Sequence, residues 1–410
     1  MTSTGTLTTS KFKSLNFTQR VGLKLSKEQL ESVITEHLSL DEGLNDVFNM
    51  VLNGLMYSER KTFLESENGT GNKGNGYRQA KRSGLGSRLS LSIPRDRLGV
   101  FKPVILGLLD QQEEQVKELC FELYGKGLTT RQIEPIIERI YGSSYSKSSI
   151  SRITTDFSSL VEAWLERPLD RSYPLVFIDA IHIKIRRDTV ATEAFYVVLG
   201  LKENLRREVL GIINIPQESA QGWEEVLGNI KARGVEKVGL FVFDGLTGLK
   251  TAVAKVFAQS MQQECILHFQ RNINKHIRKA DRKSFSEDLS AVFDPDNPSH
   301  TTENAIIMLI AVLSKWMPRY PKLKATLNRD DLSTLFTYLN FDYRIRRMIY
   351  TTNWIERLNK AFRRTLKMRN ALPNPRSAIT LIGYVAMEME EKTYSYPIIN
   401  FKFDNNFNYN

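Results

Sequence analysis

The sequence predicts an α/β protein with a mixed β-sheet that carries an all-helical insertion and is preceded by mainly helical regions. Three apolar runs have the length of buried strands, and they cover residues 174–180, 194–201 and 208–215. The short polar stretch 203–207 between the last two runs suits a hairpin turn. We therefore expect three consecutive antiparallel strands.

Helices and strands alternate after this three-stranded segment. We expect a helix at 219–233, a strand at 238–244, a helix at 247–257 and a short strand at 264–268. The order β-β-β-α-β-α-β is typical of a mixed sheet with helices packed on it. Residues 171–268 are therefore predicted to form the first part of a core domain.

The remainder of the C-terminal half is predicted to be helical. Residues 269–350 are rich in helical patterns, and we interpret them as an insertion. A strongly basic helix at 352–369 ends before Pro373. Residues 351–395 are predicted to complete the core domain, and 396–410 to form a tail.

The N-terminal part begins with a stretch of low hydrophobicity. Residues 1–24 have few large apolar side chains, so we expect a disordered arm. Ser26 and Gln29 form a possible capping box, and apolar residues at helical spacing predict two amphipathic helices within 25–65. Their apolar stripes, between Leu30 and Leu55, are a possible dimerisation surface.

The segment 66–76 is rich in Gly and Asn, which predicts a flexible linker and a domain boundary. Beyond it, residues 86–94 alternate apolar and polar side chains, as a strand or hairpin arm does. Basic residues surround this arm: Arg78, Lys81, Arg82, Arg88, Arg95 and Arg97. A basic hairpin of this kind suits contact with DNA.

Three helices are expected in the rest of the region 77–170. They cover 101–124 and 129–141, and the third opens at Ser146. With 142–146 as the turn and 146–153 as the start of a recognition helix, these helices form a helix-turn-helix candidate. Lys147 and Arg152 would then contact DNA, whereas three simply packed helices are the alternative.

Composition narrows the class of protein. The chain of 410 residues has 57 Lys and Arg against 46 Asp and Glu, and its net charge of +11 favours a nucleic acid as partner. The longest apolar run, residues 305–313, is too short to span a bilayer, and the N-terminus has no apolar signal core. Two cysteines exclude a disulfide framework. We expect a cytoplasmic protein with no membrane contact.

Three acidic residues stand out by their position. Asp179 and Asp244 each end an apolar strand-like run, where ligands often gather at the edge of a sheet. Glu356 is the one acid among nine basic residues between Arg344 and Arg369. Considered without the two aspartates, Glu356 is more simply interpreted as the partner of a basic residue in an ion pair.

Together, the three acids suit phosphoryl transfer on nucleic acid. Carboxylates bind Mg²⁺ or Mn²⁺, and two such ions can stabilise the attacking and leaving oxygens of an in-line displacement. The acids are 65 and 112 residues apart, so only the fold could bring them together.

Several segments then carry a resemblance to a known family. They read FIDAIHIKIRRD, REVLGI, KARGVEKVGLFVFDGLTGLKTAV, CILHFQRNI and YTTNWIERLNKAFRRTLK, and a further box, NGYR, contains Arg78. In this order they resemble bacterial mutator-type insertion-sequence transposases, which use a DDE triad on an RNase H-like fold. The resemblance implies that Asp179, Asp244 and Glu356 are catalytic and hold two Mg²⁺ or Mn²⁺ ions.

The resemblance also implies an activity. It is that of a DNA transposase that binds the terminal inverted repeats of its mobile element, cuts them and transfers the 3′-hydroxyl end by a copy-out, paste-in route. The partners would be double-stranded DNA at the element ends and at the target. Since two ends must be joined, a homodimer is expected. The protein would be cytoplasmic and associated with the nucleoid of a bacterium.

Other residues are expected to support these acids. Cys265 and His268 match the family's C-x-x-H element, but they make only half a zinc shell, so packing or polar support of the site is the favoured role. Contacts to DNA are predicted for the basic helix: Asn353, Arg357, Lys360, Arg363 and Arg364. Trp223 is expected in the core, with base stacking as the alternative.

Three rival functions stay open at this point. A structure-specific or RNA:DNA-hybrid nuclease could use the same triad without joining strands. A transcription regulator could act through the helix-turn-helix alone. A tyrosine or serine recombinase would need a nucleophile within its own motif, for which Tyr350 near Arg346 and Arg347 is a faint candidate.

Overall fold

The computed structural model describes residues 41–66, 71–84, 87–141, 145, 147–215, 219–329 and 331–398. The predicted arm, the first predicted N-terminal helix and its capping box, most of the predicted helix-turn-helix turn and most of the tail lie outside the described residues. The chain divides into two compact units, one of which comprises Met1–Gln115 and Tyr141–Ser144, and the other Val116–Ile140 and Tyr145–Asn410.

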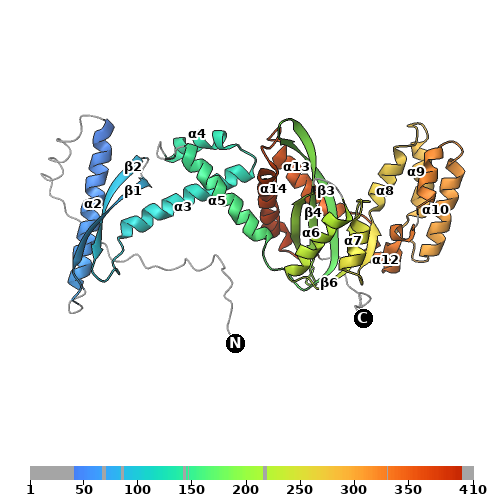
Figure 1. The fold of residues 1–410 in the computed structure, drawn as a ribbon, viewed down its shortest axis with the longest axis horizontal. Coiled ribbons are helices and arrows are strands. Elements are labelled where there is room, and N and C mark those ends of the chain that lie inside the picture. The colour runs from blue at the N-terminus through green and yellow to red at the C-terminus, as the bar shows by residue number, and fades with distance from the viewer. Residues whose placement is uncertain are drawn as a thin grey trace. The chain divides into compact units, whose positions relative to one another are not determined.

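The first unit combines a long helix with a β-hairpin (Figure 1). Helix α2 (Asp41–Ser66) packs on strands β1 (Gly74–Gly84) and β2 (Ser87–Asp96), which pair antiparallel. They share a buried core formed by Leu52, Met56, Leu89, Leu91, Ile93 and Leu109. The predicted linker therefore differs from the structure, because its last residues begin β1 and because α2 and the hairpin form one unit.

Polar side chains of α2 hold the hairpin. The Asn49 and Asn53 side chains accept backbone N–H groups of Ser90 (2.8 Å) and Ser92 (2.7 Å), which covers part of the β2 edge. The buried Arg60 guanidinium donates to the carbonyls of Gly76 (3.0 Å) and Arg95 (3.1 Å). These contacts fix both strands to the helix.

The second unit begins within helix α3 (Val104–Gly125), which is followed by α4 (Thr130–Tyr141) and α5 (Lys147–Leu165). These are the three helices that the sequence predicted before the sheet. Helix α5 packs on α14 (Pro375–Met389), where the rings of Phe157 and Tyr384 meet edge to face at 4.9 Å. The last helix before the sheet is thus part of the sheet domain.

The sheet has five strands in the order β5-β4-β3-β6-β7. The strands are β3 (Ser172–Arg186), β4 (Val190–Leu201), β5 (Arg207–Asn214), β6 (Lys237–Phe243) and β7 (Met261–Glu264). β3, β4 and β5 pair antiparallel, whereas β6 and β7 run parallel to β3. This confirms the mixed sheet, but β3 extends beyond its predicted end and residues 265–268 are not a strand.

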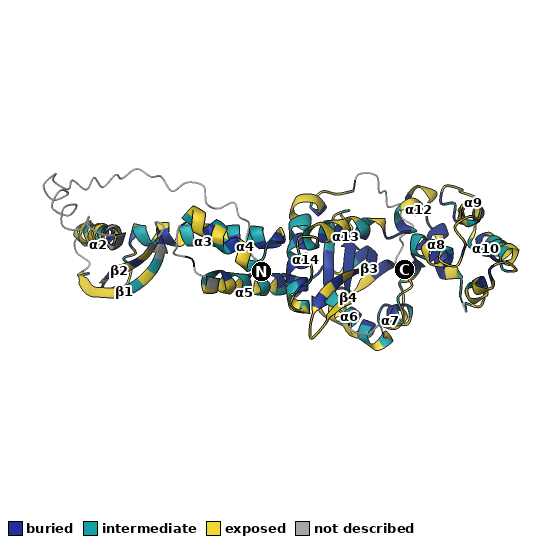
Figure 2. Cartoon of the chain, turned by 90° about the horizontal axis from the view of Figure 1, so that it is seen from above, coloured by how far each residue is buried: buried dark blue, intermediate teal, exposed yellow. Residues whose placement is uncertain are grey.

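Helices cover both faces of the sheet (Figures 1 and 2). α6 (Ala220–Ala232) and α7 (Leu249–Val256) bury one face, on a core that includes Val176 and Ile178 of β3. α13 (Asn353–Leu366) lies on the other face, where Trp354 meets Phe177 of β3 at 5.4 Å. Successive residues of β3 therefore face opposite layers.

Residues between β7 and α13 are helical, as predicted. They form α8 (Ile266–Asn274), α9 (Arg282–Val292), α10 (Thr302–Trp316), α11 (Lys324–Leu327) and α12 (Tyr343–Ile349), with short 3₁₀ turns. Within the described part of the chain, no helix combines the length and the apolar character that crossing a membrane requires.

Trp223 of α6 provides a test of the core. Its side chain is fully buried and lies edge to face with Tyr196 at 4.8 Å, which confirms the core assignment. Trp223→Ala should cost about 3–5 kcal/mol of unfolding free energy because it leaves a large cavity. Trp223→Phe should cost much less, since the indole Nε1 has no hydrogen-bond partner among the described residues. Urea denaturation of the two variants checks this, and an unchanged stability of Trp223→Ala would contradict it.

Candidate active site

Asp179 lies where β3 loses one of its neighbours. The last pair between β3 and β6 is Ile178 with Phe243, so Asp179 is the first residue of β3 beyond the end of β6. The prediction that Asp179 ends its strand is wrong, because β3 stays paired with β4 from Asp179 to Arg186. The acid is inside a strand, yet one side of that strand is open.

Asp244 follows directly after the last residue of β6, as predicted. Its side chain is partly exposed, and its Oδ1 accepts the backbone N–H of Gly245 at 2.7 Å. β3 and β6 run parallel, and their last pair is Ile178 with Phe243. Asp179 and Asp244 each come one residue after this pair, so they lie side by side at the C-terminal end of β6.

Glu356 is in the first turn of α13. The helix is anchored by the buried side chains of Ile355, Leu358 and Phe362. The Glu356 carboxylate is about three-quarters covered, and its Oε1 accepts from Nη1 of Arg271 on α8 at 3.2 Å. The ion pair that the simple interpretation expects is therefore present.

Asn359 is a site residue that the sequence reasoning missed. It is fully buried, and its Nδ2 donates to Oδ2 of Asp179 at 2.8 Å. Its Oδ1 is buried and has no hydrogen-bond partner among the described residues. Asn359 follows Glu356 by three positions, a spacing that places both on one side of a helix and could have identified it.

Cys265, His268 and Thr352 link the elements that carry the acids. The Cys265 N–H donates to the Phe243 carbonyl at the end of β6 (2.8 Å), and the Thr352 N–H donates to Cys265 Sγ (3.4 Å). Thr352 Oγ1 is 3.5 Å from Nδ1 of His268. Cys265 precedes α8 and His268 is inside it, which corrects the predicted strand: β7 ends at Glu264, and the chain turns there into a helix.

The acids and His268 interact electrostatically. Burial raises the pKa of Asp179 to about 6, against the effects of His268 and the Ala180 N–H, and the charges of Asp244 and Glu356 raise it further. The hydrogen bond with Cys265 and the charges of Asp244 and Asp179 raise the pKa of His268 to about 9, although burial opposes this. An imidazolium and a poorly compensated carboxylate therefore lie close together at neutral pH.

The site residues are of the types that bind a hard cation, but in this conformation their side chains are not grouped around a common point. Three carboxylates and the unpaired amide oxygen of Asn359 are oxygen donors of the kind that Mg²⁺ and Mn²⁺ prefer. Yet the described residues contain no group of three or more His, Cys, Asp or Glu side chains placed to hold a metal. In this conformation Arg271 engages Oε1 of Glu356, and Oε2 has no hydrogen-bond partner among the described residues.

The structure distributes the predicted DNA contacts over both units. The basic side chains of α13 and the amide of Asn353 are exposed, and Lys360 and Arg363 follow Glu356 at helical spacing: Asn353, Arg357, Lys360, Arg363 and Arg364. Arg152 is exposed on α5, and Lys147 is the first residue of that helix. Arg78 is exposed on β1 and belongs to the other unit.

The neighbours of Tyr350 argue against a tyrosine nucleophile. Arg346 is buried and donates to the carbonyls of Phe341, Asn297 and Leu339. Arg347 forms an ion pair with Asp296. Burial raises the pKa of Tyr350 as well. Both arginines have structural partners, so they do not form an anion site beside the tyrosine.

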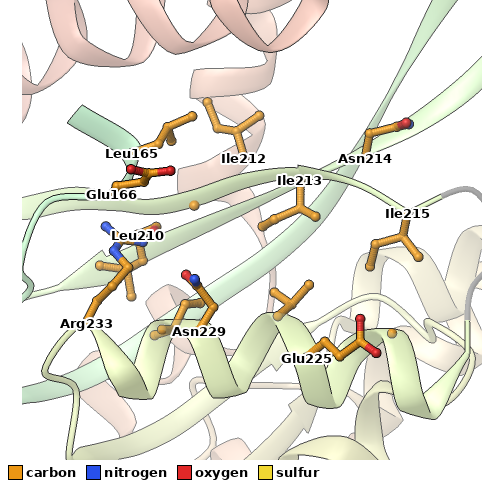
Figure 3. Close-up of a pocket in the computed structure, with 14 residues that line it drawn as sticks. Leu165, Glu166, Leu210, Ile212, Ile213, Asn214, Ile215, Glu225, Asn229 and Arg233 are labelled. Carbon is orange, nitrogen blue, oxygen red and sulfur yellow. Dashed lines mark hydrogen bonds between the residues drawn. The ribbon is translucent and has the colours of Figure 1, made fainter. Parts of the chain in front are cut away.

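Two cavities differ in their relation to the acids. One of about 300 Å³ reaches from Asp244 to the insertion, where Lys322 and Arg329 line it. The other, of about 420 Å³, lies between β5 and α6 and is lined mainly by apolar side chains such as Ile212 and Ile213 (Figure 3). The second cavity contains none of the predicted site residues.

Comparisons with known proteins place the chain among transposases. The model of a transposase family, the Mutator family, matches residues 18–395. The chain is 33% identical over 367 residues to the transposase for insertion sequence element IS1201 of Lactobacillus helveticus, covering 87% of this chain and 98% of that protein. It is 31% identical over 352 residues to the transposase for IS905 of Lactococcus lactis subsp. lactis (strain IL1403), covering 84% and 88%.

Two further matches are more distant. The transposase for IS256 in transposon Tn4001 of Staphylococcus aureus is 29% identical over 384 residues, covering 91% of this chain and 96% of that protein. A solved structure, the Drosophila P element transposase strand transfer complex, aligns at 9% identity with a TM-score of 0.27 over 68% of this chain and 79% of that chain. A superposition this loose supports no argument about fold.

The raised pKa of Asp179 predicts that Asp179→Asn stabilises the metal-free protein. Above pH 6 the folded state holds a buried carboxylate that the unfolded chain solvates, so stability falls as pH rises from about 4 through 6. The neutral amide removes this penalty, and Asn359 can turn its unpaired oxygen toward it. We expect a gain on the order of 1–3 kcal/mol at pH 8 and little gain at pH 4.5.

Thermal unfolding of the two proteins at both pH values measures this gain. Asp288→Asn is the matched control, because that carboxylate accepts from Lys315 (2.7 Å) and Trp316 (2.6 Å), which lowers its pKa. The control variant should gain no stability at pH 8. A loss of stability in Asp179→Asn at pH 8 would show that the buried charge is well compensated.

Proposed function

The chain belongs to the Mutator family of transposases, and on this premise we propose that Asp179, Asp244 and Glu356 cut DNA at the terminal inverted repeats of its mobile element and join the 3′-hydroxyl to a second phosphodiester. The observation that carries this proposal is the meeting of α13 with the open side of β3. Asn359, one turn beyond Glu356, hydrogen-bonds Asp179 one residue beyond the end of β6.

The strand order supports an RNase H-like core. Three antiparallel strands are followed by two that run parallel to the first, and the first strand is at the centre of the sheet. The first acid is on the first strand, the second follows the fourth strand, and the third lies in a helix after the all-helical insertion. This is the arrangement that the family resemblance implies.

The three carboxylates are proposed to hold two Mg²⁺ or Mn²⁺ ions. Such ions would activate water or the 3′-hydroxyl and stabilise the leaving oxygen. Asn359 fixes the orientation of Asp179 through its hydrogen bond, and the Cys265–Thr352 contacts fix α13 against the end of β6. Arg271 would exchange Glu356 for a DNA phosphate, because both anions compete for one guanidinium.

The hairpin of the first unit is proposed to bind the element ends. Leu89, Leu91 and Ile93 face α2, so the other face of the ribbon presents polar side chains, namely Gln79 and Lys81 of β1 and Arg88, Ser90 and Ser92 of β2. A two-stranded ribbon of this width fits the major groove of DNA. Arg78 pairs with Ile93 and is on the opposite face of the ribbon from these residues, where its exposed side chain would contact phosphate. Lys147 and Arg152 would act through the helix-turn-helix.

Assembly and route belong to the same proposal. Joining two element ends requires two active sites or two binding sites, so we propose a homodimer. The exposed apolar side chains of Phe48 and Val51 on α2 are candidates for its interface. The copy-out, paste-in route rests on the family resemblance alone.

Two other functions use part of the same machinery. A nuclease with the same triad would cleave the element ends without joining strands. A regulator that acts through DNA binding alone would bind the ends without cleavage and without a metal requirement. Labelled duplexes from both flanks of the gene, incubated with Mg²⁺ or Mn²⁺ and resolved on a denaturing gel, separate these outcomes.

Glu356→Gln tests the catalytic assignment. The change removes a carboxylate but no positive charge, so affinity for the element ends should be kept. Cleavage should fall by at least about a hundredfold. Glu303→Gln is the matched control on an exposed position of α10 and should cleave like the wild type. Full cleavage by Glu356→Gln would refute the triad.

Lys81→Ala and Arg88→Ala test the hairpin. Each variant should weaken binding of end DNA and reduce the slope of log affinity against log salt by about one, since each removes one phosphate contact. Lys61→Ala removes the same charge from an exposed position of α2 and serves as control. If all three variants keep the wild-type affinity and slope, the ribbon does not bind the ends.

A further inference from the structure

A basic pocket of about 310 Å³ lies between the extension of β3 and the C-terminal end of α13. Its polar lining residues are His182, Lys184, Arg363, Lys367, Arg369 and Asn370. Among the residues that the structure describes, no Asp or Glu lines it. The pocket belongs to the same compact unit as the three carboxylates.

Backbone hydrogen bonds between β3 and the segment after α13 preform this pocket. Beyond the end of β6, the segment after α13 takes its place beside β3, with a parallel bridge between Ile185 and Leu372. The Arg186 N–H donates to the Leu372 carbonyl (2.8 Å), and the Leu372 N–H donates to the Lys184 carbonyl (2.9 Å). The wall that carries Asn370 is therefore fixed to the strand that carries Lys184.

The cations of the pocket fall into two groups. Arg369 is part of the scaffold, because it donates to the carbonyls of Gly127 (3.0 Å) and Leu128 and lies 4.4 Å from the Tyr124 ring. Lys184, Arg363 and Lys367 are exposed and have no hydrogen-bond or ion-pair partner among the described residues. Three full positive charges outweigh the roughly half negative charge at the C-terminal end of a helix.

The lining indicates which part of a nucleic acid fits. The described residues that line the pocket include no Phe, Tyr or Trp, so they offer no platform on which a base could stack. Amine and guanidinium groups around a preformed hollow suit phosphate oxygens. A backbone phosphate therefore matches the chemistry better than a nucleobase.

We propose that this pocket binds a phosphodiester of a DNA strand and positions that strand across the carboxylates, an inference that rests on the proposed function. Arg363 is about 10 Å from Glu356 along α13, and Lys184 is about 16 Å from Asp179 along β3. One DNA strand advances about 3.4 Å per nucleotide. The bound phosphate is therefore about three to five nucleotides from the bond that is cut.

Single methylphosphonates, which remove the charge of one phosphate, test the pocket. They are placed one at a time within seven nucleotides on either side of the cleavage position, in end duplexes and separately in target DNA. Binding is measured in the Glu356→Gln background, and cleavage and joining are measured in the otherwise wild-type protein. The variants are Lys184→Ala, Lys367→Ala and Lys184→Arg, with Lys237→Ala as control for an exposed lysine at the other end of β6.

We expect Lys184→Ala and Lys367→Ala to bind unmodified DNA about tenfold more weakly and Lys184→Arg to bind nearly normally. One methylphosphonate should weaken binding about tenfold in the control and cause no further loss in Lys184→Ala, because both remove the same contact. The coupled position identifies the strand: inside the repeat, in the flank or in the target.

Two results would overturn the proposal. One is binding by both alanine variants that equals that of Lys237→Ala. The other is that every methylphosphonate weakens binding by the same factor in Lys184→Ala as in the Lys237→Ala control, so that the loss from the variant and the loss from the modification multiply at each position. Absence of cleavage by the wild type would instead refute the proposed function, while the affinities of Lys184→Ala, Lys367→Ala and Lys237→Ala for unmodified DNA would still show whether the pocket contributes to DNA binding.

Discussion

The unequal length of β3 and β6 determines the arrangement of the rest of the sheet domain. β6 pairs with β3 as far as Ile178, whereas β4 pairs with β3 to Arg186, so half of β3 has a free edge. Backbone groups of a buried strand need partners, and Leu372 supplies them at the far end of this edge. Asp179 lies at the near end, beside Asp244 and hydrogen-bonded to Asn359, and the basic pocket forms beside Leu372. Both therefore depend on the early end of β6.

The burial of the Asp179 carboxylate destabilises the folded state. Only 6% of this residue is exposed, and its protein hydrogen bonds come from the Ala180 N–H and Asn359. A buried carboxylate needs compensation, and the imidazolium of His268 supplies only part of it, since the pKa of Asp179 remains raised. An apolar residue would pack here at lower cost. Positions where a sequence breaks such a rule without local compensation are typical of functional sites.

Periodicity in the sequence predicted the order of elements better than their ends. The apolar runs placed the strands of the sheet and the helices α6 and α13 because burial depends on local pattern. β3 was predicted too short because its prediction followed the continuous apolar run 174–180; residues 181–186 alternate Ile with His182, Lys184 and Arg186, which is itself the pattern of a half-buried strand. Asn359 was missed although its spacing from Glu356 could have identified it, because its hydrogen bond to Asp179 forms only where α13 packs on β3. The shared core of α2 and the hairpin likewise comes from contacts across a glycine-rich segment.

The structure also separates the arginines that build the protein from the cations that can meet DNA. Arg60, Arg346 and Arg369 each donate to at least one backbone carbonyl of a distant segment, and lysine could not make the same set of bonds. Their charges contribute to the long-range field that attracts DNA. Arg60 and Arg346 are also buried, which keeps their guanidinium groups from phosphates, and Arg369 uses its Nε and Nη2 on the Gly127 and Leu128 carbonyls. The number of counterions that DNA binding releases depends on direct phosphate contacts. It therefore follows the exposed side chains of the hairpin, α13 and the basic pocket more closely than the net charge of the chain.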